Sequence, residues 1–303
     1  MCCQDQSHVS KYKKTGVGKR ESVMLIAHAL FCVAAILVLA ANQIGWLQLT
    51  SHCPLDYDHH RTSSKVLSFN TFLMPEFVSG PERTPRIAAI CKYLQSVTAK
   101  CDAVMLQEVY TDDSRQALRA CFAAVGWSAV FHEMPGYLAG LSSGLAVATR
   151  FPPSRCTFRR FSQCASVDCL SVKGMLSVDV APPRSKRFTR YINVHLQDLD
   201  RDECGAIRRD QMVDIRKEMD SAPHHVLVAG DFNIHAGSDM YVWAKHMFPG
   251  LRMPRDPTFE TGLTLDGAIG DGILDVKAVL GLNLSDHNPV EISVLADDGD
   301  FVP

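Results

Sequence analysis

One short stretch constrains the fold of this chain most strongly: residues 226–233, which read Val-Leu-Val-Ala-Gly-Asp-Phe-Asn. Its apolar, β-branched beginning is typical of a buried strand. Alternate residues of an extended segment share a face, so Asp231 and Asn233 point one way while Phe232 points back into the packing. A turn held locally by the same two polar side chains is the alternative. We interpret the stretch as a buried strand that delivers a carboxylate and an amide to one place.

The same pattern recurs at other predicted strands. Asn70, Glu108 and His195 each end an apolar run, and Asp286 and His287 directly precede the last one, residues 290–295. Amphipathic helices are predicted between strands, at 84–99, 112–125, 203–219 and 241–248. This order indicates an α/β (α+β) fold, a sandwich of β-sheets with helices, in which the polar strand ends meet at one edge.

The amino-terminal region has the features of a membrane anchor. Residues 23–41 contain no Asp, Glu, Lys or Arg, and as a helix they would span about 28 Å, close to the apolar thickness of a bilayer. Basic residues precede this segment, which places the amino terminus in the cytosol and the body outside. A cleaved secretory signal, which would make the body secreted, and a buried core helix are the alternatives.

These observations divide the chain into four parts. We expect a basic cytosolic tail at 1–22, a transmembrane signal-anchor at 23–41, a polar linker at 42–64, and an extracellular or lumenal folded domain at 65–303. Eight cysteines then lie in the exported part, where disulfides persist, although their spacing does not reveal the pairing. No cysteine or histidine spacing is typical of a structural zinc site.

Charge argues against a nucleic-acid partner. The formal net charge is −2, of which residues 1–41 carry +3, so the rest of the chain carries −5. A mildly acidic body lacks the basic face expected of a non-specific nucleic-acid binder. No obligate protein partner is inferred from the sequence.

The polar strand ends form a set suited to phosphate chemistry. Glu108 and Asn70, with Asp231 or Asp286, offer the oxygen ligands that Mg²⁺ prefers. Two histidines, His195 and His287, are available for proton transfer. Phosphodiester hydrolysis needs a cation to offset charge, a base to activate water and a donor to the leaving oxygen. No G-x-S-x-G elbow indicates acyl-transfer chemistry.

Five motifs carry a resemblance to a known family. They are Ser-Phe-Asn70, Leu-Gln-Glu108, Asn-Val-His195-Leu, Gly-Asp231-Phe-Asn233 and Ser-Asp286-His287. In order and spacing they resemble the endonuclease/exonuclease/phosphatase (deoxyribonuclease I-like) superfamily over residues 65–295. The resemblance implies a four-layer sandwich of two packed mixed β-sheets flanked by helices.

Three further stretches resemble the neutral sphingomyelinase branch, especially the secreted bacterial sphingomyelinases C. They are residues 168–174, 195–198 and 207–215. This resemblance implies a disulfide between Cys169 and Cys204, and a switch formed by Asp168 and Lys173 near the catalytic centre. A surface ion pair between Asp168 and Lys173, worth less than about 1 kcal/mol, is the alternative.

The resemblance also implies roles for the strand-end residues. Glu108 is the principal Mg²⁺ ligand with Asn70 assisting, and Mn²⁺ or Co²⁺ could substitute. His287 is the general base with Asp231 beside it, while His195 and Asn233 hold the phosphate oxygens. The aspartate of the penultimate strand is Asp271 in a predicted strand at 271–279, with Asp266 as its rival.

The chain departs from the bacterial enzymes in one respect. Only about twenty-six residues separate Thr258 from Ser285, too few for their long aromatic membrane hairpin, and we infer that the anchor replaces it. The expected function is a Mg²⁺-dependent, membrane-anchored phosphodiesterase that hydrolyses sphingomyelin or a related phosphosphingolipid to ceramide and a phosphorylated head group. The alternatives are an exported deoxyribonuclease I-like endonuclease and a non-catalytic membrane-anchored domain.

Overall fold

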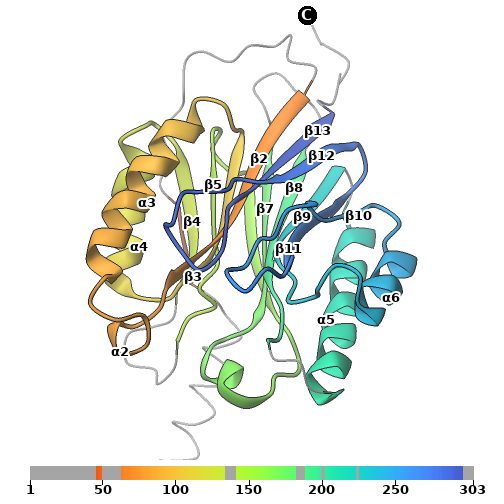
Figure 1. Cartoon of the computed structure of the whole chain (residues 1–303). Coiled ribbons are helices and arrows are strands. Elements are labelled where there is room, and N and C mark those ends of the chain that lie inside the picture. The colour runs from red at the N-terminus through yellow and green to blue at the C-terminus, as the bar shows by residue number, and fades with distance from the viewer. Residues whose placement is uncertain are drawn as a thin grey trace, which may run out of the picture. The chain divides into compact units, whose positions relative to one another are not determined.

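Two mixed β-sheets packed against each other form the centre of the fold (Figure 1). The computed structural model describes residues 46–49, 63–133, 141–181, 188–198, 202–222 and 225–295, all within one compact unit, residues 43–303. The predicted α/β fold with two mixed sheets and helices is confirmed for these residues.

The first sheet has seven strands, in the order β1-β4-β5-β3-β2-β13-β12. Their bounds are β1 (Trp46–Leu49), β2 (Ser63–Leu73), β3 (Ala103–Val109), β4 (Ser128–Glu133), β5 (Ala146–Thr149), β12 (Ile273–Ala278) and β13 (Val290–Leu295). Strands β2 and β3 are parallel, and their other neighbours are antiparallel. The middle of β2 is buried on both faces, which explains its nearly continuous apolar sequence.

The second sheet has six strands, in the order β10-β11-β9-β8-β7-β6. Their bounds are β6 (Arg155–Arg160), β7 (Gly174–Val180), β8 (Thr189–His195), β9 (His225–Asp231), β10 (Leu251–Arg252) and β11 (Asp266–Gly270). Strands β8 and β9 are parallel, with His195 opposite Asp231 in the register. Each sheet therefore contains one parallel pair, and these two pairs face each other across the core.

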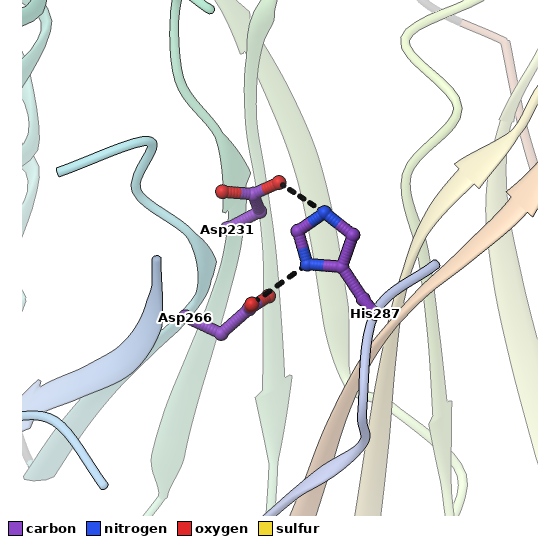
Figure 2. A group of neighbouring side chains, drawn as sticks. All are labelled: Asp231, Asp266 and His287. Atoms are coloured by element: carbon purple, nitrogen blue, oxygen red, sulfur yellow. Dashed lines mark hydrogen bonds and ion pairs between the residues drawn. The ribbon is translucent and has the colours of Figure 1, made fainter. Parts of the chain in front are cut away.

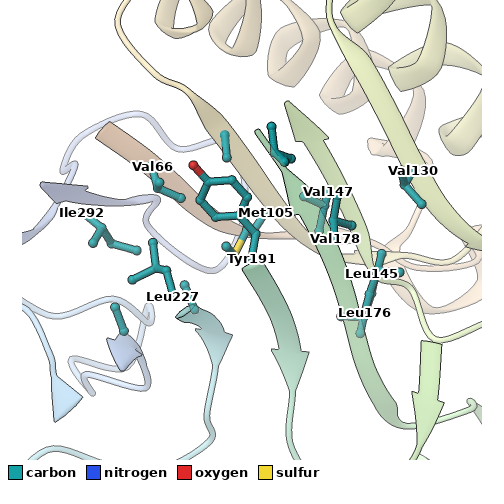
Figure 3. Close-up of a cluster of buried hydrophobic side chains, with 14 of the residues drawn as sticks. Val66, Met105, Val130, Leu145, Val147, Leu176, Val178, Tyr191, Leu227 and Ile292 are labelled. Atoms are coloured by element: carbon teal, nitrogen blue, oxygen red, sulfur yellow. The ribbon is translucent and has the colours of Figure 1, made fainter. Parts of the chain in front are cut away.

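Three apolar clusters hold the layers together. One lies between the sheets and includes Met105, Val147 and Leu227 (Figure 3). The second packs helices α3 (Arg83–Thr98) and α4 (Asp112–Ala123) on the first sheet, and the third packs α5 (Asp202–Asp220) and α6 (Asp239–Met247) on the second. The order of layers is thus helix, sheet, sheet, helix, and all four helices begin and end within two residues of the predicted bounds.

Two short helical turns lie outside these layers. Helix α2 (Glu76–Ser79) follows β2, and the 3-10 helix η1 (Ser166–Leu170) precedes β7. Neither contains a buried residue. Both lie at the end of the sandwich towards which β2 and β8 run (Figure 1).

The structure contains strands that the sequence prediction did not include, among them β1, β10 and β11. Strand β11 was not predicted, because glycines at 267 and 270 give residues 266–270 a low strand propensity. Pairing with β9 on one side and β10 on the other holds this segment extended nonetheless. Strand β1 lies within the expected linker at 42–64 and pairs with β4.

The predicted membrane anchor, residues 23–41, lies outside the described residues. Within the described ranges, no helix has both the length and the apolar character needed to cross a bilayer.

The disulfides differ from the pairing that the resemblance implied. Cys164 is bonded to Cys169 around η1, and Cys91 of α3 is bonded to Cys121 of α4. The predicted Cys169–Cys204 bond is therefore wrong, and Cys204 is a buried free thiol on α5. Cys164 is a nearer partner because only five positions separate the two cysteines, and the turn between them brings their Cα atoms to 5.3 Å.

Gly230 is the residue on which the close approach of β8 and β9 depends. Its φ is 152°, and a Cβ atom there would lie 1.9 Å from the carbonyl oxygen of Val194. We expect Gly230→Ala to lower the free energy of unfolding by about 3 kcal/mol or more, because the two strands must separate. Urea denaturation measures the change. Gly237→Ala is the matched control, since φ there is 90° with open space around the position, and it should cost only about 1 kcal/mol. Equal losses of unfolding free energy in the two variants would contradict a steric clash specific to position 230.

His132 on β4 is expected to make the fold sensitive to acid. Its ring is buried and stacked on Phe158 of β6 at 3.6 Å between centroids. Burial, with the charge of Arg115, lowers its pKa to about 3. As the pH falls below about 6.5, the unfolded chain binds a proton that folded His132 does not, so stability is lost. Unfolding free energy measured between about pH 7 and about pH 5 should therefore fall less steeply in His132→Asn than in the unsubstituted chain.

Candidate active site

Polar side chains from both sheets meet at the edge where the parallel strands end. Asn70 and Glu108 come from β2 and β3, while His195, Asp231 and Asp266 come from β8, β9 and β11. His287 comes from the loop before β13. Because the two sheets contribute different members, the group forms only when the sheets pack together.

The Asp231 carboxylate is the centre of this group. Its Oδ2 atom accepts a hydrogen bond of 3.1 Å from Asn70 Nδ2 and lies 3.7 Å from His195 Nε2 and 3.6 Å from His287 Nε2. Its Oδ1 atom accepts a 2.9 Å bond from the backbone N–H of Asn233. Asp231 is 1% exposed. A carboxylate in this position can orient both histidines.

Asn70 joins the two sheets at the site. Besides its bond to Asp231, its Nδ2 atom donates a 3.1 Å bond to Glu108 Oε1. Its Oδ1 atom accepts a bond from the backbone N–H of Phe72, so the amide nitrogen faces the carboxylates. In this arrangement Asn70 orients Glu108, and it would have to turn its amide to present oxygen to a cation.

Backbone strain marks two positions of the site. Glu108 has a φ of 60° and Asn233 a φ of 50°, both in the left-handed region that side-chain-bearing residues seldom adopt. Each such position costs on the order of 1 kcal/mol or more and persists only where its surroundings impose it. Here the bonds from Asn70 to Glu108 and from Asn233 to Asp231 do so.

His287 is held between two aspartates. Its Nδ1 atom lies 2.8 Å from Asp266 Oδ2, which leaves Nε2 directed toward Asp231 (Figure 2). The Phe259 ring packs against the imidazole at 4.8 Å between centroids. An imidazole whose Nδ1 atom is bonded to a carboxylate has a fixed orientation, which is how a general base is commonly held.

The titrating groups influence one another because they are buried. Burial raises the pKa of Glu108 to about 7, and burial with the nearby Asp266 charge raises the pKa of Asp231 to about 6. Burial by itself lowers the pKa of His287, but Asp266 and Asp231 outweigh it and raise the value to about 10. Burial and the charges of Lys173 and His287 hold the pKa of His195 well below its usual range. A bound cation would lower the pKa values of Glu108 and His287.

The donor set fits a divalent metal ion. Glu108 Oε2 is buried and has no hydrogen-bond partner among the described residues. Asp231, Asp266 and His287 also offer ligand atoms within 4.8 Å of one another. However, His287 Nδ1 already bonds to Asp266. The unpaired oxygen of Glu108 is therefore available as a ligand for such an ion.

Lys173 lies beside the site and is not part of a surface ion pair. Its side chain is 2% exposed, 3.3 Å from Asp168 Oδ1, and donates to the carbonyl oxygen of Leu196 at 2.9 Å. Asn233 Nδ2 donates to the same carbonyl at 3.2 Å. The charge of Lys173 lowers the pKa values of both Glu108 and His195. A buried cation thus lies close enough to Glu108 and His195 to act on both by its charge.

Two predicted site residues lie elsewhere or at the margin. Asp271 is exposed in the turn between β11 and β12, so its placement in the site is wrong, and its rival Asp266 occupies that position. Asp286 accepts a bond from the Ser285 hydroxyl and is partly exposed. Its charge raises the pKa values of Glu108 and His287, but it is not among the residues whose ligand atoms lie within 4.8 Å of one another.

A buried amide pair beneath the site was missed. Gln107 Nε2 donates a 2.7 Å bond to Asn193 Oδ1, and Asn193 Nδ2 donates to the carbonyl oxygens of Leu106 and Ala146. These bonds cross from the second sheet to the first. The sequence did place these amides near site residues, since Gln107 adjoins Glu108 and Asn193 shares a strand face with His195. Their bond to each other, however, forms only when the two sheets pack together.

The chain is similar to known proteins in both sequence and fold. A model of the endonuclease/exonuclease/phosphatase family matches residues 67–287. Sphingomyelinase C from Streptomyces griseocarneus superposes with a TM-score of 0.63 at 19% identity, over 77% of this chain and 99% of that chain. Beta toxin from Staphylococcus aureus, solved with bound magnesium ions, gives a TM-score of 0.62 at 15% identity, over 76% and 99%. A humanized D. rerio TDP2 gives 0.60 at 16% identity, over 78% and 100%.

One curated relative is much longer than this chain. An uncharacterized protein of Dictyostelium discoideum is 26% identical over 176 residues, which is 50% of this chain. The chain spans only 15% of the length of that protein.

The described residues thus form two stacked mixed sheets with a buried Asp/Asp/His cluster, which could hold a metal ion, at their shared edge. The family match covers most of the chain and includes every member of the cluster. The chain belongs to the endonuclease/exonuclease/phosphatase family.

Proposed function

We propose that this protein is a Mg²⁺-dependent phosphodiesterase that hydrolyses sphingomyelin or a related phosphosphingolipid to ceramide and a phosphorylated head group. Mn²⁺ or Co²⁺ could replace Mg²⁺, because the oxygen donors of the site accept all three ions. The observation that carries the substrate class is the pair of Asp168 with the buried Lys173 beside His195, within a stretch that resembles the neutral sphingomyelinases. The likeness of the fold to sphingomyelinase C supports the same substrate class.

The side chains divide the hydrolytic work. When bound at Glu108, the metal ion offsets charge on the phosphoryl oxygens. His287, oriented by Asp266, removes a proton from the attacking water through Nε2. Asp231 holds the two histidines in place. His195 and Asn233 bind the phosphate oxygens, and Lys173 contributes a fixed positive charge beside them.

The location of the domain is also a proposal. Two disulfides in the described residues fit an oxidising compartment. We place the catalytic domain, residues 65–303, on the extracellular or lumenal side of a membrane crossed by residues 23–41, or in the secreted fraction if that segment is cleaved.

Head-group release tests the proposal. Full-length protein in detergent micelles should release phosphocholine from sphingomyelin with Mg²⁺ present and stop when a chelator is added. The assay should include phosphatidylcholine, to measure head-group preference, and supercoiled plasmid at low salt. Plasmid nicking without lipid turnover would instead establish the exported endonuclease, the second candidate.

The endonuclease is favoured by one observation, the match to a family whose description includes endonucleases. The net charge of −5 outside residues 1–41 argues against it. A non-catalytic membrane-anchored domain is the third candidate, and it would show neither activity under any of these conditions. The intact set of buried acids and histidines is the reason to rank it last.

A further inference from the structure

A cavity of about 790 Å³ lies on the second sheet, between its edge strand β6 and the carboxyl-terminal end of α5. Its size is within the range of pockets that hold small molecules. None of the residues of the candidate active site lines it. The cavity is instead lined by three arginines and two acids, Arg155, Arg159, Arg190, Asp179 and Glu218. We call it the arginine cavity.

The pairing of β6, β7 and β8 brings these side chains together. Arg155 lies opposite Asp179 in the register, and Asp179 lies opposite Arg190. Residues paired in this way share a face of the sheet, and Arg159 shares that face with Arg155 because four positions separate them. Glu218 reaches the same face from α5, with Oε1 3.2 Å from Arg190 Nη1 and Oε2 2.9 Å from Arg159 Nη2.

The charges that line the cavity do not cancel. Three guanidinium groups face two carboxylates, which leaves one positive charge. Arg190 is buried and directs three of its nitrogens at the carboxylates of Asp179 and Glu218. The side chain of Arg155 is exposed and has no ion pair or hydrogen bond among the residues that the structure describes. The surplus charge therefore belongs to Arg155.

The lining indicates the class of ligand. Guanidinium groups bind phosphate through two parallel hydrogen bonds, and phosphate has enough oxygen atoms to accept from two arginines at once. The Arg159 side chain is 55% exposed and is paired only through Nη2, so its other nitrogens are available along with those of Arg155. The Phe158 ring also lines the cavity and offers an apolar contact. A phosphate ester, which joins a phosphate to an organic group, fits both features.

We propose that the arginine cavity is a second ligand site, which binds the phosphate group of a phosphate ester. Arg155 and Arg159 hold the phosphate, and the buried ion pairs of Arg190 fix the floor of the cavity. Arg190 and His195 are five residues apart on β8, or about 17 Å, so a ligand held here leaves the active site open. The inference does not depend on the proposed function, because it requires binding alone.

Isothermal titration tests the site without requiring catalysis. Inorganic phosphate, phosphocholine and dihexanoyl phosphatidic acid are each titrated into full-length protein in detergent micelles, with a chelator present. The test variant is Arg155→Gln. Arg160→Gln is the matched control, because Arg160 is also exposed on β6 but alternation places it on the other face. His195→Ala reports any phosphate that binds in the active site.

We expect phosphate compounds to bind about tenfold or more weakly to Arg155→Gln than to the unsubstituted protein, and equally well to Arg160→Gln. Equal affinity in the two arginine variants would overturn the proposal, as would no binding of any titrant to the unsubstituted protein. A loss confined to His195→Ala would also overturn it, by locating the phosphate in the active site.

The titrants also distinguish the source of the phosphate. Tighter binding of phosphocholine would identify a free phosphorylated head group, and tighter binding of dihexanoyl phosphatidic acid would identify a lipid head group; either order supports a phosphate site. Because no turnover is measured, a protein that does not hydrolyse sphingomyelin can still show this site, and an active hydrolase can lack it.

Discussion

His287→Ala is expected to lower kcat for head-group release by about a thousandfold or more while leaving the fold intact. The ring is 7% exposed, and its Nδ1 atom is held 2.8 Å from Asp266. Nε2, which faces Asp231 at 3.6 Å, is the ring nitrogen left to accept a proton from water once a bound cation lowers the raised pKa of His287. The measurement is the initial rate at saturating substrate, with urea denaturation to confirm that the variant is folded.

Matched variants separate this role from a general effect of mutation. Asp266→Asn should lower kcat by about a hundredfold, because it weakens the hold on the imidazole. Asp271→Asn and His246→Ala should leave kcat unchanged, since both side chains are exposed and away from the cluster. A larger loss in Asp271→Asn than in Asp266→Asn would show that the acid beside the base has been assigned to the wrong residue.

Glu108→Gln is expected to weaken Mg²⁺ binding more than about a hundredfold and to abolish turnover at ordinary Mg²⁺ concentrations. Loss of a supporting partner of a metal ligand already costs about tenfold to a hundredfold in affinity, so loss of the ligand should cost more. The amide keeps the size of the side chain and its contact with Asn70 but removes the charge. Isothermal titration with Mg²⁺ gives the affinity directly.

The melting temperature provides a second, independent measure of Mg²⁺ binding. An ion that binds the folded state raises the melting temperature as its concentration rises. This Mg²⁺-dependent rise should disappear in Glu108→Gln and persist in Glu203→Gln, which changes an exposed glutamate on α5. A rise of equal size in both variants would locate the ion at Asp231, Asp266 and His287 instead.

Strong local patterns explain why most of the fold could be predicted. Helix α4 has apolar residues at helical spacing, and β3 and β9 have uninterrupted apolar runs, so periodicity alone identifies them. Strand β11 has neither signal, because its five residues include two glycines. Its extended conformation comes from β9 and β10, which lie far away in the sequence.

The sequence prediction favoured Asp271 over Asp266 wrongly, because the difference between them also depends on pairing with a distant strand. Both precede a glycine within a similar short motif, and no local feature distinguishes them. The register of β11 against β9 places Asp266 directly opposite Asp231, whereas Asp271 falls in the turn beyond the strand. The disulfide pairing could not be predicted from local sequence either. Cys204 is a buried free thiol on α5, and its spacing from the other cysteines does not reveal that it is unpaired.

The sequence by itself determined which side chains end the buried strands, because hydrophobic alternation and strand ends are local properties of the chain. It thereby supplied Asn70, Glu108, His195, Asp231 and His287 as candidates. Only the tertiary structure decided which of them touch, which aspartate supports the base and that Lys173 is buried beside them. Those contacts join residues of opposite sheets, and they exist only after the sheets have excluded water from the seam between them.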